Sequence, residues 1–151
     1  MFNLHQIIPT RLRRWLSMLW LHEGTPGERA RGVAAGVFSG CFPLFGLQTI
    51  IGIALARIVR GNSLLAAGGT WISNPITYLP LYWLNYKIGT LIIQKEQPIN
   101  IRDSFNLPSI LNGSWDLASK VLLGSTIVGI IMASITGYIT FLLLKTYSNN
   151  K

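Results

Sequence analysis

The chain has little charge for its length and few of the residues from which soluble catalytic or metal sites are built. Only 12% of its 151 residues are charged and 50% are hydrophobic, and the mean hydropathy is +0.41. The single cysteine, Cys41, excludes an intrachain disulfide and a cysteine-rich metal site. Its apolar neighbours predict a small, unreactive core residue. This composition favours lipid over water as the main surroundings of the chain.

Acidic residues are scarce, with 5 Asp and Glu against 13 Lys and Arg, which gives a formal net charge of +8. In a soluble protein this excess would suggest nucleic acid as a partner. Here the basic residues stand at the edges of apolar runs, a pattern typical of contact with anionic lipid headgroups. We therefore expect a lipid bilayer with anionic headgroups as the partner, and no nucleic acid.

Motifs of catalytic and cofactor sites are also missing. The two histidines, His5 and His22, lie near the N-terminus, far in sequence from any carboxylate pair. There is no metal-ligand spacing and no phosphate-binding glycine loop, because the glycines are dispersed through apolar segments. We expect a protein that is not an enzyme, with no catalytic, cofactor-binding or metal-binding residues.

The N-terminal segment lacks the uninterrupted apolar region of a cleavable signal peptide, because Arg11, Arg13 and Arg14 interrupt it. Its apolar residues recur with a period of about 3.6 residues, which indicates an amphipathic helix. We expect residues 1–24 to form a helix in the membrane interface. A surface helix packed on the rest of the protein is the alternative.

A helix start is encoded at Thr25, Pro26 and Glu28, where Thr25 and Glu28 have the spacing of a capping box and proline suits the first helical position. The following residues, 32–56, carry no formal charge. This run is long enough to cross a hydrocarbon core of roughly 30 Å. The sequence therefore predicts a helix that begins near Pro26 and enters the membrane.

Pro43 and Gly46 interrupt this first run near its middle, since proline lacks an amide proton and clashes with the preceding turn. We expect two half-helices within residues 26–60. Basic residues precede the run, and Arg57 and Arg60 follow it. If basic residues mark the cytoplasmic side, both ends of the run and the N-terminus lie there. This favours a re-entrant hairpin, with a kinked full span as the alternative.

A second run, residues 61–86, is also free of Asp, Glu, Lys and Arg and shows the same construction. The segments AAGVFSGCFP (34–43) and AAGGTWISNP (66–75) align without gaps, with Ala-Ala-Gly and the final proline identical. An internal repeat and a chance match in an Ala- and Gly-rich background both remain open. The pattern predicts a second broken helix over residues 62–94.

Two broken helices in lipid raise the question of where their free backbone groups find partners. Lipid cannot satisfy them, so the breaks must be buried against protein or line a wet cavity. Secondary transporters use paired broken helices to present such groups to a solute. We expect one shared polar pocket, with Gln48 close to Asn74 and with Arg60 and Asn62 at its entrance. The predicted pocket residues are Pro43, Gly46, Gln48, Thr49, Arg60, Asn62, Ser73, Asn74, Pro75 and Thr77.

The remaining sequence predicts a polar loop over residues 94–120 and a transmembrane helix over residues 121–144, which contain no charge and no proline. Small residues at spacings of four or five along this helix allow close approach of another helix. The expected fold is an all-α integral membrane protein, with residues 25–151 as a single membrane domain. The small residues are Gly124, Gly129, Ala133 and Gly137.

Three stretches, GVFSGCFPLFGLQT, RGN and TWISNPITYLPLYWLNYKIG, resemble the signature of the bacterial membrane family catalogued as domain of unknown function 2062. The resemblance covers about residues 25–93 and, more loosely, the final helix. Its most specific pieces are Pro43-x-x-Gly46-x-Gln48, Arg60-x-Asn62 and Asn74-Pro75-x-Thr77. The resemblance implies a small integral protein of the bacterial inner membrane and brings no catalytic residue. In some members a similar domain accompanies a glycosyltransferase, which points to envelope lipid or glycan metabolism.

Two functions from different classes remain open. In the first, the paired breaks handle a small solute or a lipid headgroup through uncharged donors and acceptors. In the second, the same groups only satisfy the broken backbone, and the protein is a non-catalytic scaffold, a homo-oligomer or an assembly partner in a membrane complex. The absence of a charged residue inside the apolar runs favours the second, because coupled transport usually requires an ionisable group in the membrane.

Overall fold

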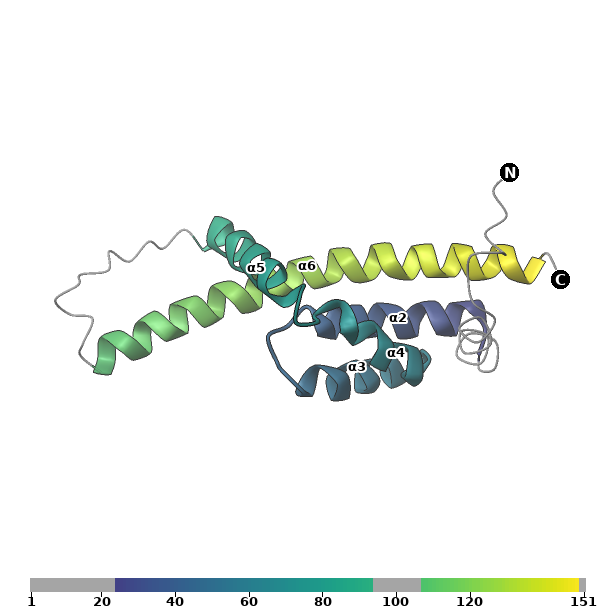
Figure 1. Cartoon of the computed structure of the whole chain (residues 1–151), viewed down its shortest axis with the longest axis horizontal. Coiled ribbons are helices and arrows are strands. Elements are labelled where there is room, and N and C mark those ends of the chain that lie inside the picture. The colour runs from purple at the N-terminus through teal and green to yellow at the C-terminus, as the bar shows by residue number, and fades with distance from the viewer. Residues whose placement is uncertain (1–23, 94–106, 150–151) are drawn as a thin grey trace.

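The computed structural model describes residues 24–93 and 107–149 (Figure 1). Every regular element in these ranges is helical, which confirms the predicted all-α class. The predicted N-terminal helix, residues 1–24, lies outside the described residues apart from Gly24. The elements are α2 (Pro26–Gly40), α3 (Leu47–Ile58), α4 (Ser63–Gly69), the 3-10 helix η2 (Thr70–Ile72), α5 (Tyr78–Ile92) and α6 (Leu107–Asn149).

Helix α2 begins at the predicted residue. The Thr25 hydroxyl oxygen accepts a hydrogen bond from the backbone N–H of Glu28 at 3.3 Å, and the Glu28 carboxylate accepts one from the N–H of Thr25 at 2.8 Å. This is the reciprocal capping box that the sequence predicts. The helix ends at Gly40, and the chain turns through Gly46, whose φ of +82° is a conformation that favours glycine. The predicted break in the first run is thus confirmed.

The first run folds into a hairpin, because α3 returns antiparallel along α2 (Figure 1). At the open end of the hairpin, the Arg31 guanidinium donates hydrogen bonds of 3.3 and 2.8 Å to the carbonyl oxygen of Arg60. The N–H of Asn62 donates to the carbonyl oxygen of Glu28 at 2.9 Å. Both ends of the run therefore lie together, as the predicted hairpin requires.

A stripe of glycines on α2 lets α4 pack against it with almost no separation. A Cβ atom at Gly36 would collide with the backbone of Ala66, and similar close contacts would occur about one turn before and one turn after it along both segments. Because the contacts advance in the same direction on both helices, α4 runs parallel to α2. The two segments that align in sequence therefore lie side by side. The paired positions are Gly32 with Asn62, Gly36 with Ala66, and Gly40 with Thr70.

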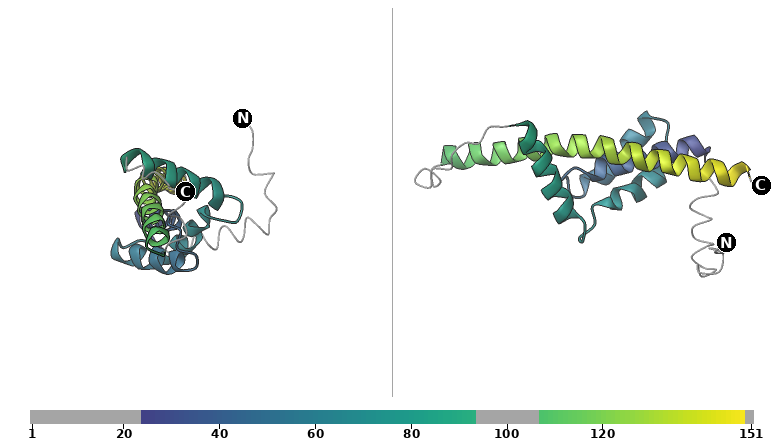
Figure 2. Two further views of the ribbon diagram at one scale, coloured as in Figure 1. Left: turned by 90° about the vertical axis from the view of Figure 1, so that its left-hand side faces the viewer. Right: turned by 90° about the horizontal axis from the view of Figure 1, so that it is seen from above.

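Helix α6 packs antiparallel along α2 through the predicted small-residue stripe. Gly129 meets the Phe38 ring, and Gly137 meets Ala34. Farther toward its N-terminal end, α6 is crossed by α5, and Figure 2 shows this oblique crossing. There Gly124 lies against the backbone of Asn85, so that the stripe is used for packing within the chain.

The polar loop predicted over residues 94–120 differs from the structure, in which α6 already begins at Leu107. Only residues 94–106 stay outside the helices, and they lie outside the described residues. Two interactions stabilise the extra helical turns: Lys120 pairs with Asp116 at 2.6 Å one turn earlier, and the Lys120 backbone packs against Gly89 of α5. Tertiary packing of this kind overrides the turn signals in the local sequence.

The predicted transmembrane helix, residues 121–144, lies wholly inside α6. Among the described residues, α6 is the one helix long and apolar enough to cross a membrane, and its apolar part runs from Gly113 to Thr146. These 34 residues correspond to roughly 51 Å of helix, more than the ~30 Å of a hydrocarbon core.

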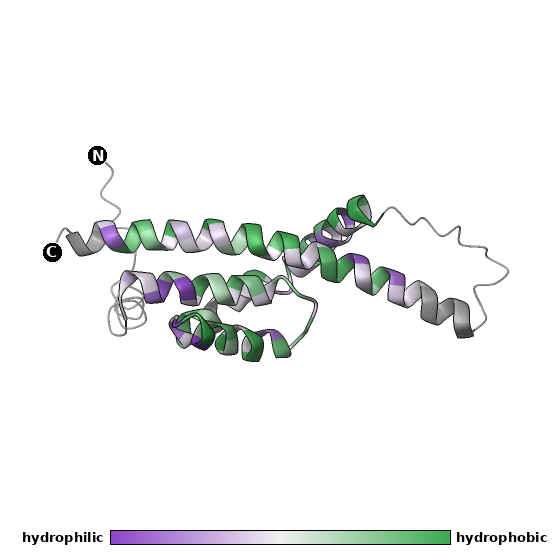
Figure 3. Cartoon of the chain, turned by 180° about the vertical axis from the view of Figure 1, so that it is seen from behind, coloured by the Kyte–Doolittle hydropathy of each residue, from purple (hydrophilic) through white to green (hydrophobic). Residues whose placement is uncertain are grey.

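The interior of the fold is built from small residues, whereas many large apolar side chains are exposed. Figure 3 shows that hydrophobic residues (green) occur along all the helices of the fold. Ile76 is 85% exposed and Trp71 is 79% exposed. Soluble proteins of this size rarely expose so much contiguous apolar surface. Cys41 is fully buried, as predicted. The buried hydrophobic residues are Ala30, Ala35, Val37, Cys41, Ala56, Ala66 and Val128.

Candidate functional site: the two helix breaks

The two helix breaks lie at the same end of the cluster formed by α2, α3 and α4. The first turn of α3 reaches the second break, where the Ser73 hydroxyl donates to the side-chain oxygen of Gln48 at 3.1 Å. One residue further along α3, the hydroxyl of Thr49 lies 3.3 Å from the hydroxyl of Thr70. Gln48 thus pairs with Ser73, the neighbour of Asn74, and its predicted approach to Asn74 itself stays a prediction.

The second break, residues 73–77, is held by its own polar side chains. The Asn74 side-chain oxygen accepts hydrogen bonds from the backbone N–H groups of Ile76 at 2.9 Å and Thr77 at 3.1 Å. The Thr77 hydroxyl accepts from the N–H of Asn74 at 3.0 Å and donates to the carbonyl oxygen of Ile72. This is an Asx-type turn, in which side chains replace the missing helical partners. The side-chain oxygen of Asn74 and the hydroxyl of Thr77 therefore already form hydrogen bonds within the protein.

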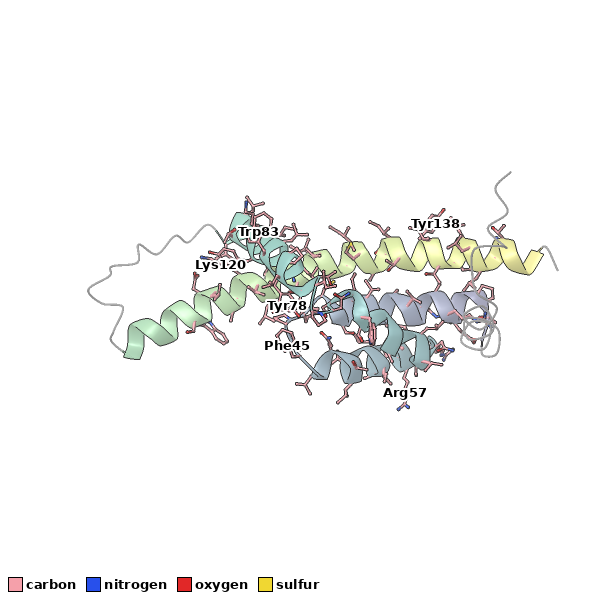
Figure 4. The ribbon with its side chains drawn as sticks, viewed as in Figure 1. Phe45, Arg57, Tyr78, Trp83, Lys120 and Tyr138 are labelled. Carbon is pink, nitrogen blue, oxygen red and sulfur yellow. The ribbon has the colours of Figure 1, made fainter. Side chains whose placement is uncertain are left out.

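Aromatic rings connect the first break to α5. The Phe45 ring packs edge-to-face on the rings of Tyr78 and Tyr82, with centroids 5.9 and 5.8 Å apart, and Figure 4 shows Phe45 next to Tyr78. Pro43 is half-buried in this break, whereas Pro75 is exposed in the other. Contacts between rings, rather than a solvent-filled space, therefore join α5 to the first break.

Asn85 is a buried polar residue that the predicted pocket omits. Its side chain is fully buried on α5, where the amide group donates to the carbonyl oxygen of Cys41 at 2.8 Å and to the hydroxyl of Ser125 at 2.9 Å. The amide thereby connects the end of α2 with α5 and α6. Its own oxygen has no hydrogen-bond partner among the described residues. The sequence did contain a signal, because an asparagine inside a charge-free apolar run needs a buried partner.

Arg60 and Asn62 do not lie at the breaks. The 12 residues of α3, about 18 Å of helix, separate them from Gln48. The side-chain oxygen of Asn62 accepts from the N–H of Leu65 at 2.9 Å and caps the start of α4. Arg60 has a left-handed φ of 52° at the end of α3. The predicted entrance residues therefore belong to the opposite end of the helix cluster.

A shallow hollow lies along α4 and is mostly apolar. Of the predicted pocket residues only Thr49 lines it, so the hollow is distinct from the polar contacts between the breaks. Across the described ranges, no group of three His, Cys, Asp or Glu side chains is placed to hold a metal ion. Other lining residues are Val33, Leu64, Leu65, Ala67, Gly68, Gly69 and Trp71.

Comparison with known proteins identifies the family of the chain. No curated protein and no solved structure matches it. A family model described as "Uncharacterized protein conserved in bacteria (DUF2062)" matches residues 10–151, a range that includes both helix breaks. The chain therefore belongs to this family of uncharacterized bacterial proteins.

Proposed function

We propose that this chain is an integral protein of the bacterial inner membrane whose broken helices build a compact scaffold for assembly with other membrane components. One observation carries the proposal: the polar side chains at the breaks pair with one another and with the broken backbone. Gln48 pairs with Ser73, Thr49 with Thr70, and Asn74 with the second break itself. Groups saturated in this way serve the fold.

The distribution of exposed and buried side chains supports placement in the membrane. Many large apolar side chains are exposed, while small residues such as glycine, alanine and serine lie at the helix contacts, as is typical of helices that pack in lipid. A soluble protein with this surface would aggregate. The apolar part of α6 exceeds the thickness of a hydrocarbon core.

Charge supports an orientation with the open end of the α2–α3 hairpin in the cytoplasm. Arg29 and Arg31 lie near the start of α2, and Arg57 and Arg60 lie at the end of α3, where Arg31 contacts the carbonyl oxygen of Arg60. The C-terminal end of α6, which carries Lys145, lies toward the same end (Figure 1). Helix α2 has 15 residues, about 22 Å, and so reaches less than the full ~30 Å of the core before the chain turns back. In this placement α2 and α3 form a re-entrant hairpin.

Aromatic residues support the position of the opposite interface. Trp83 and Trp115 are exposed on α5 and α6 beyond the breaks, and the Lys87 ammonium lies 4.3 Å from the Trp83 ring centroid. Tryptophan and lysine together are typical of the headgroup region. In the proposed placement, α5 reaches this second interface and α6 returns the chain to the cytoplasmic side.

Handling of a small solute or a lipid headgroup at the breaks is the second candidate, and one observation favours it. The side-chain oxygen of Asn85 is buried without a hydrogen-bond partner, and a polar ligand or a water molecule would supply the missing donor. The neighbouring polar groups at the breaks have their partners within the chain, which favours the scaffold instead.

The two candidates differ in what happens when a polar pair is removed as a unit. In the scaffold account, Ser73→Ala and Gln48→Leu each lower the free energy of unfolding by about 1–3 kcal/mol. The double variant recovers part of this loss, because neither partner of the pair is left without the other. Rescue of a deletion strain should follow stability in all three variants.

The control for this experiment is Thr126→Ala, which removes an exposed hydroxyl bonded only within α6. A double variant that folds as well as the wild type but fails to rescue growth would contradict the scaffold and support a binding site at the breaks.

A further inference from the structure

The shallow hollow along α4 lies on the outer surface of the helix cluster and is lined mostly by apolar side chains. Its walls include Val33, Leu64 and Leu65, and its far end is Trp71, which is 79% exposed. The floor is open at Gly68, where an added Cβ atom would meet no atom within 4 Å. The missing side chain thus leaves open space on this face of α4.

Two arginines stand at the cytoplasmic end of this hollow. Arg57 and Arg60 are exposed, and Leu64, which lines the hollow, follows Arg60 by four residues in the sequence. Figure 4 shows Arg57 projecting away from α3. No hydrogen bond or ion pair joins either guanidinium to the described residues, and the nearest acidic side chain in the sequence, Glu28, is engaged in the capping box. Within residues 24–93 and 107–149, this end therefore presents positive charge that no acidic side chain neutralises by a direct ion pair.

Arg60 occupies the position at which α3 ends, where the N–H of Gly61 donates to the carbonyl oxygen of Ala56 at 2.6 Å. It adopts the left-handed conformation, φ 52°, that commonly ends a helix and is usually filled by glycine. A glycine, Gly61, follows immediately. An arginine here is exposed at the open end of the α2–α3 hairpin, and its guanidinium can form paired hydrogen bonds with phosphate oxygens.

We propose that the hollow binds one acyl chain of an anionic phospholipid, with its phosphate held between Arg57 and Arg60. The proposal rests on the membrane placement proposed above and adds a specific lipid site to it. The charge at one end and the apolar walls along α4 match the two halves of such a lipid. The planar guanidinium forms paired hydrogen bonds with phosphate oxygens, which a zwitterionic headgroup shields with its own cation.

Two pairs of variants separate the acyl part of the site from the charged part. Gly68→Leu fills the hollow without touching the protein, and Gly113→Leu is its control, since a Cβ at Gly113 also meets no atom within 4 Å and both changes raise helix propensity. Arg57→Gln with Arg60→Gln removes the charge. Lys145→Gln is the charge control, because it lies on α6 across α2 from the hollow.

The test is native mass spectrometry of the purified full chain in dodecyl maltoside, titrated with palmitoyl-oleoyl phosphatidylglycerol. We expect a one-to-one complex with the wild type. Gly68→Leu should abolish it, and the double arginine variant should weaken it about 25-fold, since each basic residue near an anionic headgroup contributes about fivefold. The two control variants should bind as the wild type does.

Two further ligands determine whether both halves of the lipid are needed. Phosphatidylcholine with the same acyl chains should bind at least tenfold more weakly, and glycerophosphoglycerol, which lacks the chains, should not bind. Equal binding of phosphatidylcholine, full binding by the Gly68→Leu variant, or equal loss in both controls would overturn the proposal. Membrane fractionation of each variant keeps this test separate from the placement in the membrane, because a lost lipid site leaves the protein in the membrane fraction.

Discussion

The side-chain amide nitrogen of Asn85 lies 2.8 Å from the carbonyl oxygen of Cys41, 44 residues earlier in the chain. Through this bond, α5 satisfies a backbone group at the end of α2 that the first helix break leaves without a helical partner. The same amide donates to Ser125 on α6. One buried side chain thus holds three helices where the two broken runs meet.

Replacing Asn85 by leucine should lower the free energy of unfolding by about 1–3 kcal/mol, because the carbonyl of Cys41 and the hydroxyl of Ser125 would both lose a buried partner. Ser125→Ala should cost less, since the bond to Cys41 stays. Thermal unfolding of the purified protein in detergent, followed by circular dichroism, measures both. Thr126→Ala, on the same helix but exposed, is the control. Unchanged unfolding of Asn85→Leu would show that the amide does not hold the helices together.

The close packing of α2 on α4 predicts opposite effects for two glycine-to-alanine changes. Gly36→Ala places a methyl group against the backbone of Ala66 and should destabilise by about 1–3 kcal/mol or more. Gly68→Ala meets no atom and should stabilise by up to about 1 kcal/mol through helix propensity. The melting temperatures of the two variants test this difference, and an equal effect of both changes would contradict the parallel packing of the two helices.

At the second break, the acceptor oxygen of Asn74 matters more than its amide group, which makes one long contact of 3.5 Å to Trp71. Asn74→Asp keeps this acceptor and should therefore be more stable than Asn74→Ala, although a carboxylate at membrane depth carries a cost of its own. Asn74→Ala and Asn74→Leu should lose about 1–3 kcal/mol, because the N–H groups of Ile76 and Thr77 lose their acceptor. Fluorescence-detected size-exclusion chromatography after heating compares the variants. Equal stability of the alanine and aspartate variants would rule out this role of the oxygen.

At the start of α2, Thr25→Ala removes the hydroxyl of the capping box and should cost about 1 kcal/mol, whereas Thr25→Ser retains the acceptor and should stay within a few tenths of wild type. Chemical unfolding in detergent is the measurement. A serine variant as unstable as the alanine variant would mean that the side-chain methyl group, rather than the hydroxyl, stabilises the helix start.

The helix start and the helix breaks could be predicted from the sequence because they depend on neighbouring residues. The start of α2 follows from Thr25, Pro26 and Glu28, and both breaks follow from prolines in apolar runs, because a capping box and a missing amide act within one helical turn. The small residues of α6 indicated close helix packing for a similar reason. Each of these signals depends on neighbours a few residues apart.

Long-range contacts are what the sequence did not reveal. The start of α6 at Leu107 depends on packing of Lys120 against Gly89, so the polar composition of residues 107–120 was misleading. Asn85 meets partners 44 and 40 residues away. The sequence also predicted Arg60 at the entrance to the breaks. In the structure, α3 leads away from the breaks, so Arg60 lies at the opposite end of the helix cluster.

The central claim is that the cluster of α2, α3 and α4, and not α6 alone, is embedded in the bilayer. It is tested most directly by a nitroxide spin label at Ile50→Cys in a Cys41→Ala background, with the protein in liposomes. Ile50 is 64% exposed near the break of the first run, and Arg57→Cys at the cytoplasmic end is the reference. The account predicts that dissolved oxygen relaxes the label at residue 50 more than a water-soluble nickel chelate does, with the reverse order at residue 57. Preferential relaxation of residue 50 by the nickel chelate would place the hairpin in water and contradict the account.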